Sequence, residues 1–90
     1  FVPGVTDPPT IRRLAAAVPA PLNIMAGPGA PSTVELRELG VARVSVGPAI
    51  TLSVMAQVRR AATEVLREGT YEALRNGMPF ADANGLFSRA

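Results

Sequence analysis

The stretch that most limits the fold of this chain runs from Pro21 to Pro31, with the sequence PLNIMAGPGAP. A five-residue run, 22–26, which is apolar except for Asn23, leads into a loop with two glycines and two prolines, and a helix start follows at once. Such a run is typical of a strand buried on both faces of a parallel sheet. Ligands of parallel α/β folds bind at the carboxyl ends of strands, so we expect a site at this loop. The loop itself offers backbone atoms and little side-chain chemistry.

The amount of apolar sequence is high for the length of the chain. Ninety residues allow at most one domain. A chain of this size buries only about 60 to 65% of the surface that it exposes when unfolded. Because 48% of the residues are hydrophobic and only 18% are charged, we expect another part of the protein to cover the excess apolar surface.

The composition also excludes several classes of function. All nine basic residues are arginine, and they are scattered over predicted helices, so we expect no nucleic-acid binding. The sequence has neither Cys nor His, which removes disulfides, thiolate chemistry, and the commonest general base and metal ligand. The lack of Cys fits a cytoplasmic protein. No apolar run approaches the roughly 20 residues that span a bilayer, so we expect no membrane segment.

Local signals divide the chain into alternating strands and helices. Asp7 ahead of Pro8 is a helix N-cap pattern, Ser32 with Glu35 is a capping box, and Gly40 is placed to end the second helix. The predicted strands are 1–4, 22–26 and 41–46; the predicted helices are 8–17, 33–39 and 49–68, followed by short helices at 71–75 and 80–87.

Helical spacing predicts which side chains these helices bury. For the first helix the predicted buried residues are Ile11, Leu14, Ala15 and Val18. The long helix carries an apolar stripe of Leu52, Met55, Val58, Ala62, Val65 and Leu66. Thr70 is the predicted cap of the short helix that follows.

The order of these elements indicates an α/β fold. Alternation of strands and helices favours parallel strands joined by right-handed crossovers. About 20 residues per unit suit a (β/α)8 TIM barrel, which takes some 200 to 250 residues. Three strands cannot close a barrel. We therefore expect residues 1–90 to be a single partial domain, the C-terminal third of such a barrel with about three βα units and terminal helices.

Two strand-to-helix loops are candidate anion sites. The segment 27–29, Gly-Pro-Gly, precedes a capped helix, so its backbone N–H groups could cradle a phosphate or carboxylate. The segment 45–48 has the same form. For both loops, a tight turn without a ligand is the alternative.

Three polar residues interrupt the predicted strands. Asn23 and Ser45 could face a substrate, or they could be hydrogen-bonded polar groups within the fold. Arg43 could clamp a carboxylate, or it could lie at the entry end of its strand and reach solvent.

The acidic residues offer no recognisable catalytic arrangement. Asp7 is better explained as a cap than as a metal ligand, and the other acids lie on helices. No carboxylate pair has the arrangement that acid–base or metal chemistry needs, so we assign no catalytic residue and no metal ligand. Arg59 and Arg60 with Glu64 form a predicted solvated i,i+4 group. The last helix, with its apolar residues, is expected to dock on its own barrel or on a neighbouring subunit.

Nearly the whole chain resembles one known family. The stretch is FVPGVTDPPTIRRLAAAVPAPLNIMAGPGAPSTVELRELGVARVSVGPA, followed by a long helix, GTYEAL and a terminal ADANGLF. It resembles the C-terminal end of isocitrate lyase/phosphoenolpyruvate mutase family proteins, which include carboxyvinyl-carboxyphosphonate phosphorylmutase-like members. The match would run from the sixth barrel strand through the last helices.

The resemblance implies a Mg2+-dependent lyase or phosphonomutase. Such an enzyme cleaves or forms C–C or P–C bonds of 2-oxoacid, phosphonate or phosphoenolpyruvate-type substrates, and the metal stabilises an enolate-like intermediate. Members of the family are commonly homotetramers that exchange a C-terminal helix, for which 49–68 with its tail is the matching segment. The metal-binding acids and the gating loop of the family lie on earlier strands, so this chain alone is predicted to be inactive.

The resemblance also indicates which residues lie near the substrate. The sixth-strand end, where lyases have Glu and mutases have His, falls here at Pro3 and Gly4. The seventh-strand end, where lyases have Asn and Ser or Thr, falls near Met25 and Gly27. Neither position has a polar side chain here, so the substrate is left open. With the two loops, the predicted substrate-proximal residues are Pro3, Gly4, Met25, Gly27, Gly29 and Gly47.

A non-catalytic role is the alternative function. The chain could be a small α/β module, or a fragment whose exposed sheet edge and apolar surface form an oligomer. A monomer that unfolds cooperatively would favour the module.

Overall fold

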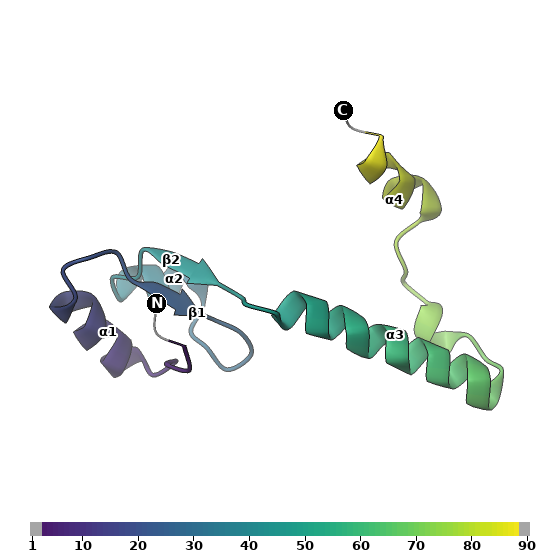
Figure 1. Cartoon of the computed structure of the whole chain (residues 1–90), viewed down its shortest axis with the longest axis horizontal. Coiled ribbons are helices and arrows are strands. Elements are labelled where there is room, and N and C mark those ends of the chain that lie inside the picture. Colours follow the sequence, from purple (N-terminus) through teal and green to yellow (C-terminus); the bar gives the residue numbers. More distant parts are fainter. Residues whose placement is uncertain (1–2, 89–90) are drawn as a thin grey trace. The chain divides into compact units, whose positions relative to one another are not determined.

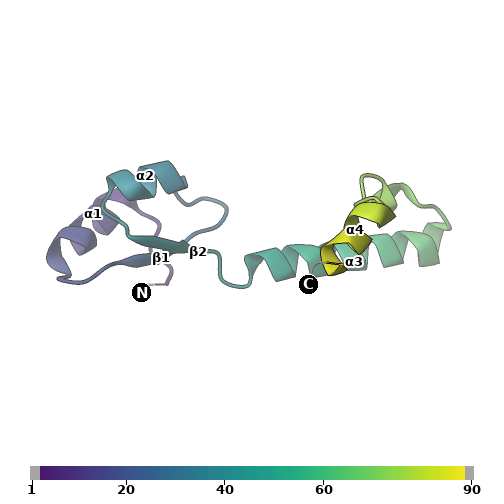
Figure 2. The ribbon, with the colours of Figure 1, turned by 90° about the horizontal axis from the view of Figure 1, so that it is seen from above.

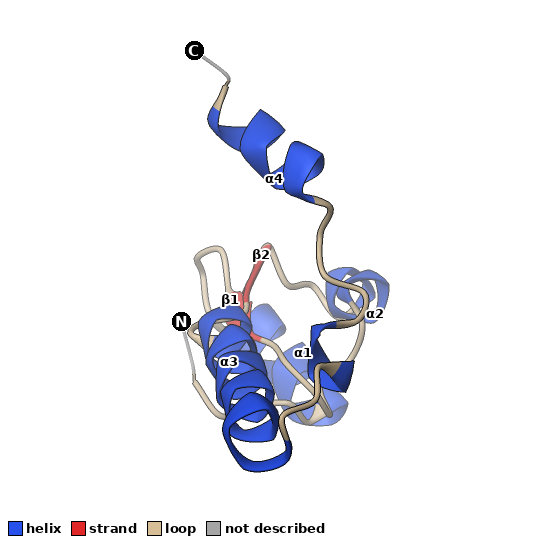
Figure 3. Cartoon of the chain, turned by 90° about the vertical axis from the view of Figure 1, so that its right-hand side faces the viewer, coloured by secondary structure: helices blue, strands red, loops and turns tan. Residues whose placement is uncertain are grey.

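The structure is a computed structural model that describes residues 3–88. Contacts within the chain group it into two units, Phe1–Leu52 and Ser53–Ala90, which are described separately. The elements in order are α1 (Pro8–Ala17), β1 (Asn23–Met25), α2 (Thr33–Glu38), β2 (Arg43–Ser45), α3 (Ala49–Glu68), the 3-10 helix η1 (Glu72–Leu74) and α4 (Phe80–Phe87) (Figure 1). Figure 3 shows that helices outweigh strands in the described part of the chain.

The first unit is built on a two-stranded parallel sheet. β1 pairs with β2 so that Asn23 lies opposite Arg43 and Met25 lies opposite Ser45. The helix α2 is the crossover between the two strands. Figure 2 shows α1 and α2 on the same face of this sheet.

The core of the first unit lies between the sheet and these two helices. Its fully buried side chains are Ile11 of α1, Ile24 of β1 and Leu36 of α2, joined by the buried Leu22 and Val41. Successive side chains of a strand point to opposite faces. Because Ile24 faces the helices, its neighbours Asn23 and Met25 point to the face that α1 and α2 leave uncovered.

Local hydrogen bonds fix where the first two helices begin and end. The Asp7 carboxylate accepts a bond of 3.0 Å from the Thr10 backbone N–H and caps α1. Ser32 and Glu35 form the predicted capping box of α2, with bonds of 3.2 and 2.9 Å. Gly40 follows α2 with φ of +99°, a conformation that glycine adopts without the steric cost that other residues incur.

The second unit contains most of the long helix α3 and has no buried core among its described residues. None of its described residues is buried, although many of its apolar side chains are large. The predicted stripe of α3 is therefore exposed within this chain, from Leu52 to Leu66. In residues 3–88, no helix combines the length and apolar character that crossing a membrane requires.

The strands are shorter than the sequence patterns indicate. Each has three residues, 23–25 and 43–45, in place of the predicted 22–26 and 41–46. Leu22 already contacts the neighbouring segment, because its carbonyl accepts bonds from the N–H groups of Ala42 and Arg43. The apolar residues therefore continue beyond the residues that pair in the sheet, 23–25 and 43–45, which is why the sequence predicted longer strands. In the predicted strand 1–4, Pro3 and Gly4 form a turn, while Phe1 and Val2 lie outside the described residues.

Three further local predictions differ from the structure. Val18 follows the end of α1 and is 37% exposed rather than buried, because its backbone is extended there. The segment predicted as a helix at 71–75 is the shorter η1, and Thr70 does not cap it. The Thr70 hydroxyl instead donates to Glu64 of α3. The helix predicted at 33–39 ends at Glu38, with Leu39 as its C-cap.

Candidate functional site

The carboxyl ends of β1 and β2 bring two of the predicted site residues together. Because the strands are parallel, both following loops leave the sheet at one edge. The Ala26 N–H donates to the Ser45 carbonyl over 2.7 Å and ties this edge. Gly47 has φ of +53°, and a Cβ added there would lie 2.7 Å from the Met25 sulfur. Met25 and Gly47 therefore pack against each other.

The loop after β1 is a turn with open space around its glycines. The Ala30 N–H donates to the Gly27 carbonyl over 3.0 Å, and Gly29 has φ of +92°. A Cβ added at either glycine would meet no atom within 4 Å. The Glu35 carboxylate already accepts the Ser32 N–H at the start of α2, which places a negative charge there. These contacts favour a tight turn over an anion cradle at the 27–29 loop.

The remaining predicted pair belongs to the segment that precedes α1. Pro3 and Gly4 form an exposed turn ahead of α1. A Cβ added at Gly4 would meet no atom within 4 Å, so the space beside this glycine is open.

A row of three polar side chains lies on the sheet face that the helices leave uncovered. The Arg43 guanidinium donates to Asn23 Oδ1 over 3.2 Å. Asn23 Nδ2 in turn donates to Ser45 Oγ, also over 3.2 Å. Each side chain in the row therefore donates to the next, from Arg43 at the start of β2, through Asn23, to Ser45 at the carboxyl end of β2.

This arrangement suits the binding of an anionic oxygen. Ser45 Oγ accepts the bond from Asn23, so the hydroxyl proton of Ser45 can be donated to another group. The guanidinium of Arg43 adds a permanent positive charge to the same face. Of the two hypotheses for Asn23 and Ser45, the structure supports the hydrogen-bonded pair, and that pair also leaves a donor at the strand end.

The sequence alone marked these three residues as polar positions in the strands, but it did not indicate that they belong to the site. The available signal was a polar residue within each short apolar strand. Spacing alone does not show that Asn23 reaches Ser45, because the two are diagonal neighbours whose contact depends on strand register.

Two acidic residues of the described chain, Asp7 and Glu64, are held by hydrogen bonds that lower their pKa. The Thr10 hydroxyl and N–H lower the pKa of Asp7, as a cap requires. The Thr70 hydroxyl and the N–H groups of Ala73 and Glu72 lower the pKa of Glu64. Among residues 3–88, no three His, Cys, Asp or Glu side chains lie together in a way that could hold a metal ion. The residues described here therefore do not fit a Mg2+ site.

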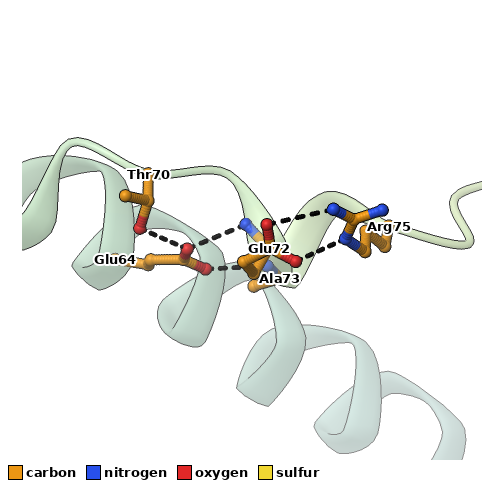
Figure 4. A network of polar contacts seen from close by, with 5 residues as sticks. All are labelled: Glu64, Thr70, Glu72, Ala73 and Arg75. Atoms are coloured by element: carbon orange, nitrogen blue, oxygen red, sulfur yellow. Dashed lines mark hydrogen bonds and ion pairs between the residues drawn. The ribbon is translucent and has the colours of Figure 1, made fainter.

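Glu64 differs from its predicted role as part of a solvated pair with Arg60. Its carboxylate accepts three hydrogen bonds from the segment after α3 (Figure 4). Arg60 instead donates to Gln57 on its own helix. The i,i+4 spacing would allow an ion pair between Arg60 and Glu64. In the structure, the segment after α3 instead places three hydrogen-bond donors on the Glu64 carboxylate.

Comparison with known proteins identifies relatives of the chain. Residues 1–66 match the family model for phosphoenolpyruvate phosphomutase. A protein from Burkholderia cenocepacia J2315 described as a lyase/mutase is 40% identical in sequence, with a TM-score of 0.88 over 97% of this chain. A second protein from the same organism, described as a phosphonomutase, is 40% identical, with a TM-score of 0.65 over 78% of this chain. The matches span 32% and 26% of those two chains. No curated protein matches the sequence.

Proposed function

Because the chain belongs to the phosphoenolpyruvate phosphomutase/isocitrate lyase family, we propose that the intact protein is a lyase or phosphonomutase that acts on C–C or P–C bonds. The substrates are 2-oxoacids, phosphonates or phosphoenolpyruvate-type molecules, which share a carboxylate or phosphonate group. In this proposal β1 and β2 are the seventh and eighth strands of a (β/α)8 barrel, whose ligands bind at the carboxyl ends of strands. The protein is placed in the cytoplasm, in keeping with a sequence that has no cysteine.

The observation that carries the proposal is the polar row on the uncovered sheet face. An α/β barrel has its helices outside and its site inside, and α1 and α2 cover one face of this sheet only (Figure 2). The other face carries Arg43, Asn23 and Ser45, which end in a hydroxyl at the substrate edge. A carboxylate or phosphonate oxygen is the natural acceptor for that hydroxyl.

Residues of this chain would orient the substrate. Ser45 donates its proton to an anionic oxygen, Asn23 holds the Ser45 hydroxyl in place, and Arg43 holds Asn23. Met25 and Gly47 close the edge beside this hydroxyl. The Mg2+ that the family resemblance implies would stabilise an enolate-like intermediate, and its ligands would come from residues outside this chain.

An activity panel with the full-length protein tests the proposal. The purified protein is incubated with Mg2+ and either 2-oxoacids or phosphonopyruvate, and products are followed by phosphorus and proton NMR. The Ser45→Ala variant is expected to lose about 10- to 100-fold in kcat/KM, the effect of removing one substrate hydrogen bond. Thr63→Ala, which removes an exposed hydroxyl from α3, is the matched control and should leave the activity unchanged. Absence of turnover across the whole panel would refute the proposed reaction class.

The second unit supports a homo-oligomer in which neighbouring subunits exchange the C-terminal helix segment. Its described side chains are not buried, and α3 and η1 line an open apolar groove of about 550 Å3. The lining residues are Val58, Ala61, Ala62, Val65, Leu66 and Leu74. A surface of this kind is typical of an interface. Light scattering on the full-length protein should give a multiple of the subunit mass, and a monomeric mass would contradict the exchange. A monomer without activity would favour the non-catalytic module.

A further inference from the structure

Two polar side chains of α3 hold one residue of the returning chain from both sides. Glu64 Oε1 accepts the Ala73 backbone N–H over 2.7 Å. Gln57 Nε2 donates to the Ala73 backbone carbonyl over 2.6 Å. Gln57 and Glu64 are seven residues apart, about two helical turns, so they lie on the same side of α3. Both backbone groups of Ala73 are therefore bound by the same helix.

The Glu64 carboxylate binds two more donors from the same segment. Its Oε2 atom accepts the Thr70 hydroxyl over 2.6 Å and the Glu72 N–H over 2.8 Å (Figure 4). Three donors on one carboxylate stabilise its ionised form. The ion pair of Arg75 with Glu72 occupies the Glu72 carboxylate, so Glu72 does not compete for these donors.

Few other contacts hold this segment. The described residues of the second unit include no buried side chain, so no hydrophobic core fixes the turn between α3 and η1. The half-buried residues among the described part of the second unit are Gln57, Ala61, Glu64, Ala73 and Ala83. Three of these five, Gln57, Glu64 and Ala73, take part in the hydrogen bonds described above. Apart from Leu74, which lines the apolar groove with residues of α3, the segment 70–75 is held to α3 by its hydrogen bonds to Glu64 and Gln57.

We propose that Gln57 and Glu64 form a clamp on Ala73 that closes when Glu64 is ionised and opens when Glu64 is protonated. A protonated carboxyl has one O–H donor of its own and cannot accept all three bonds in the present geometry. Opening releases the segment 70–75 from α3. Leu74 also lines the apolar groove of α3, so opening removes one wall of that groove. The inference does not depend on the proposed activity.

The sign of the pH dependence follows from the contacts of Glu64. The pKa of Glu64 is lowered in the folded chain, first by the Thr70 hydroxyl and then by the Ala73 and Glu72 N–H groups. The clamp is therefore complete above about pH 4.3, the ordinary value for glutamate, and is lost as pH falls through the lower folded value. The other charged groups around Glu64 are Arg60, Arg67 and Glu68 of α3 and Glu72 of η1.

Amide hydrogen exchange of the full-length protein tests the clamp. At pH 7, Glu64→Gln should speed exchange at Glu72 and Ala73 about fivefold or more, because the glutamine NH2 group faces N–H donors. Glu68→Gln removes the same charge one turn further along α3 and should change these rates by no more than a factor of about two. Amides in the middle of α3 are the internal reference. Circular dichroism checks that each variant is folded.

A titration of the unsubstituted protein provides a second test without any variant. After correction for intrinsic exchange, protection of the Ala73 amide should fall below about pH 4.3 while the reference amides stay protected. Gln57→Ala should weaken protection at all pH values and leave the acid transition in place, because glutamine does not titrate. Unchanged Ala73 protection between pH 7 and 3, or equal rates in Glu64→Gln and Glu68→Gln, would overturn the proposal.

Discussion

Replacement of Gly47 by alanine tests the packing at the edge of the candidate site. Gly47 has φ of +53°, and an added Cβ would lie 2.7 Å from the Met25 sulfur. The left-handed conformation costs an alanine about 1–2 kcal/mol. Ordinary contact begins at 3.4 Å, so the sulfur has to move by 3.4 − 2.7, or about 0.7 Å. Overpacking costs about 1–3 kcal/mol, and the flexible methionine side chain places this case near the lower end. The sum is about 2–4 kcal/mol.

Two further variants separate these contributions. Gly69 has φ of +68° and no atom within 4 Å of an added Cβ, so Gly69→Ala reports the backbone cost alone, about 1–2 kcal/mol. Met25→Ala removes the sulfur, so in a double-mutant cycle it should recover about 1 kcal/mol of the Gly47→Ala loss. The free energy of unfolding is measured by urea denaturation of the full-length protein at one fixed concentration. A Gly47→Ala loss no greater than that of Gly69→Ala, or no coupling to Met25, would refute the close packing.

Two other predictions concern the first unit. Ile24 is fully buried between the sheet and both helices, so Ile24→Ala should cost about 2–5 kcal/mol and Ile24→Val about 0.5–1.5 kcal/mol in urea denaturation; equal losses would contradict its place in the core. Asp7→Ala should lower the thermal midpoint at pH 7, because the ionised carboxylate caps α1 through Thr10. Since the pKa of Asp7 is lowered in the folded chain, this difference should shrink as pH falls below about 3.9. Asp7→Asn keeps a capping oxygen and is the matched control; a difference that persists at pH 2 would contradict the assignment.

Local rules predicted the parts of the fold that depend on neighbouring residues. The helix start at Asp7, the capping box of Ser32 with Glu35, and the glycine after α2 all depend on residues within one turn of each other. The long helix between Pro48 and Gly69 is bounded in the same way. Strand ends were less predictable, because apolar residues such as Leu22 continue past the last paired position and look the same in the sequence.

Only part of the candidate site could be predicted from the sequence. The glycines and prolines after the strands predicted a site at the edge of the sheet. Asn23 and Ser45 were recognisable as polar residues within apolar strands. It did not connect them, because their hydrogen bond joins residues 22 positions apart and depends on register. That Pro3 and Gly4 lie near the substrate was predicted from the resemblance alone and stays a prediction.

The sequence by itself determined the order of the elements, the caps of the first two helices, and an excess of apolar residues for so short a chain. These properties follow from backbone conformation and composition, which act over a few residues. Tertiary structure decided which groups meet: Met25 with Gly47, Asn23 with Ser45, and Glu64 with Ala73 in place of Arg60. A carboxylate accepts bonds from the donors that the folded chain brings closest, and sequence spacing supplies only one of the possible partners.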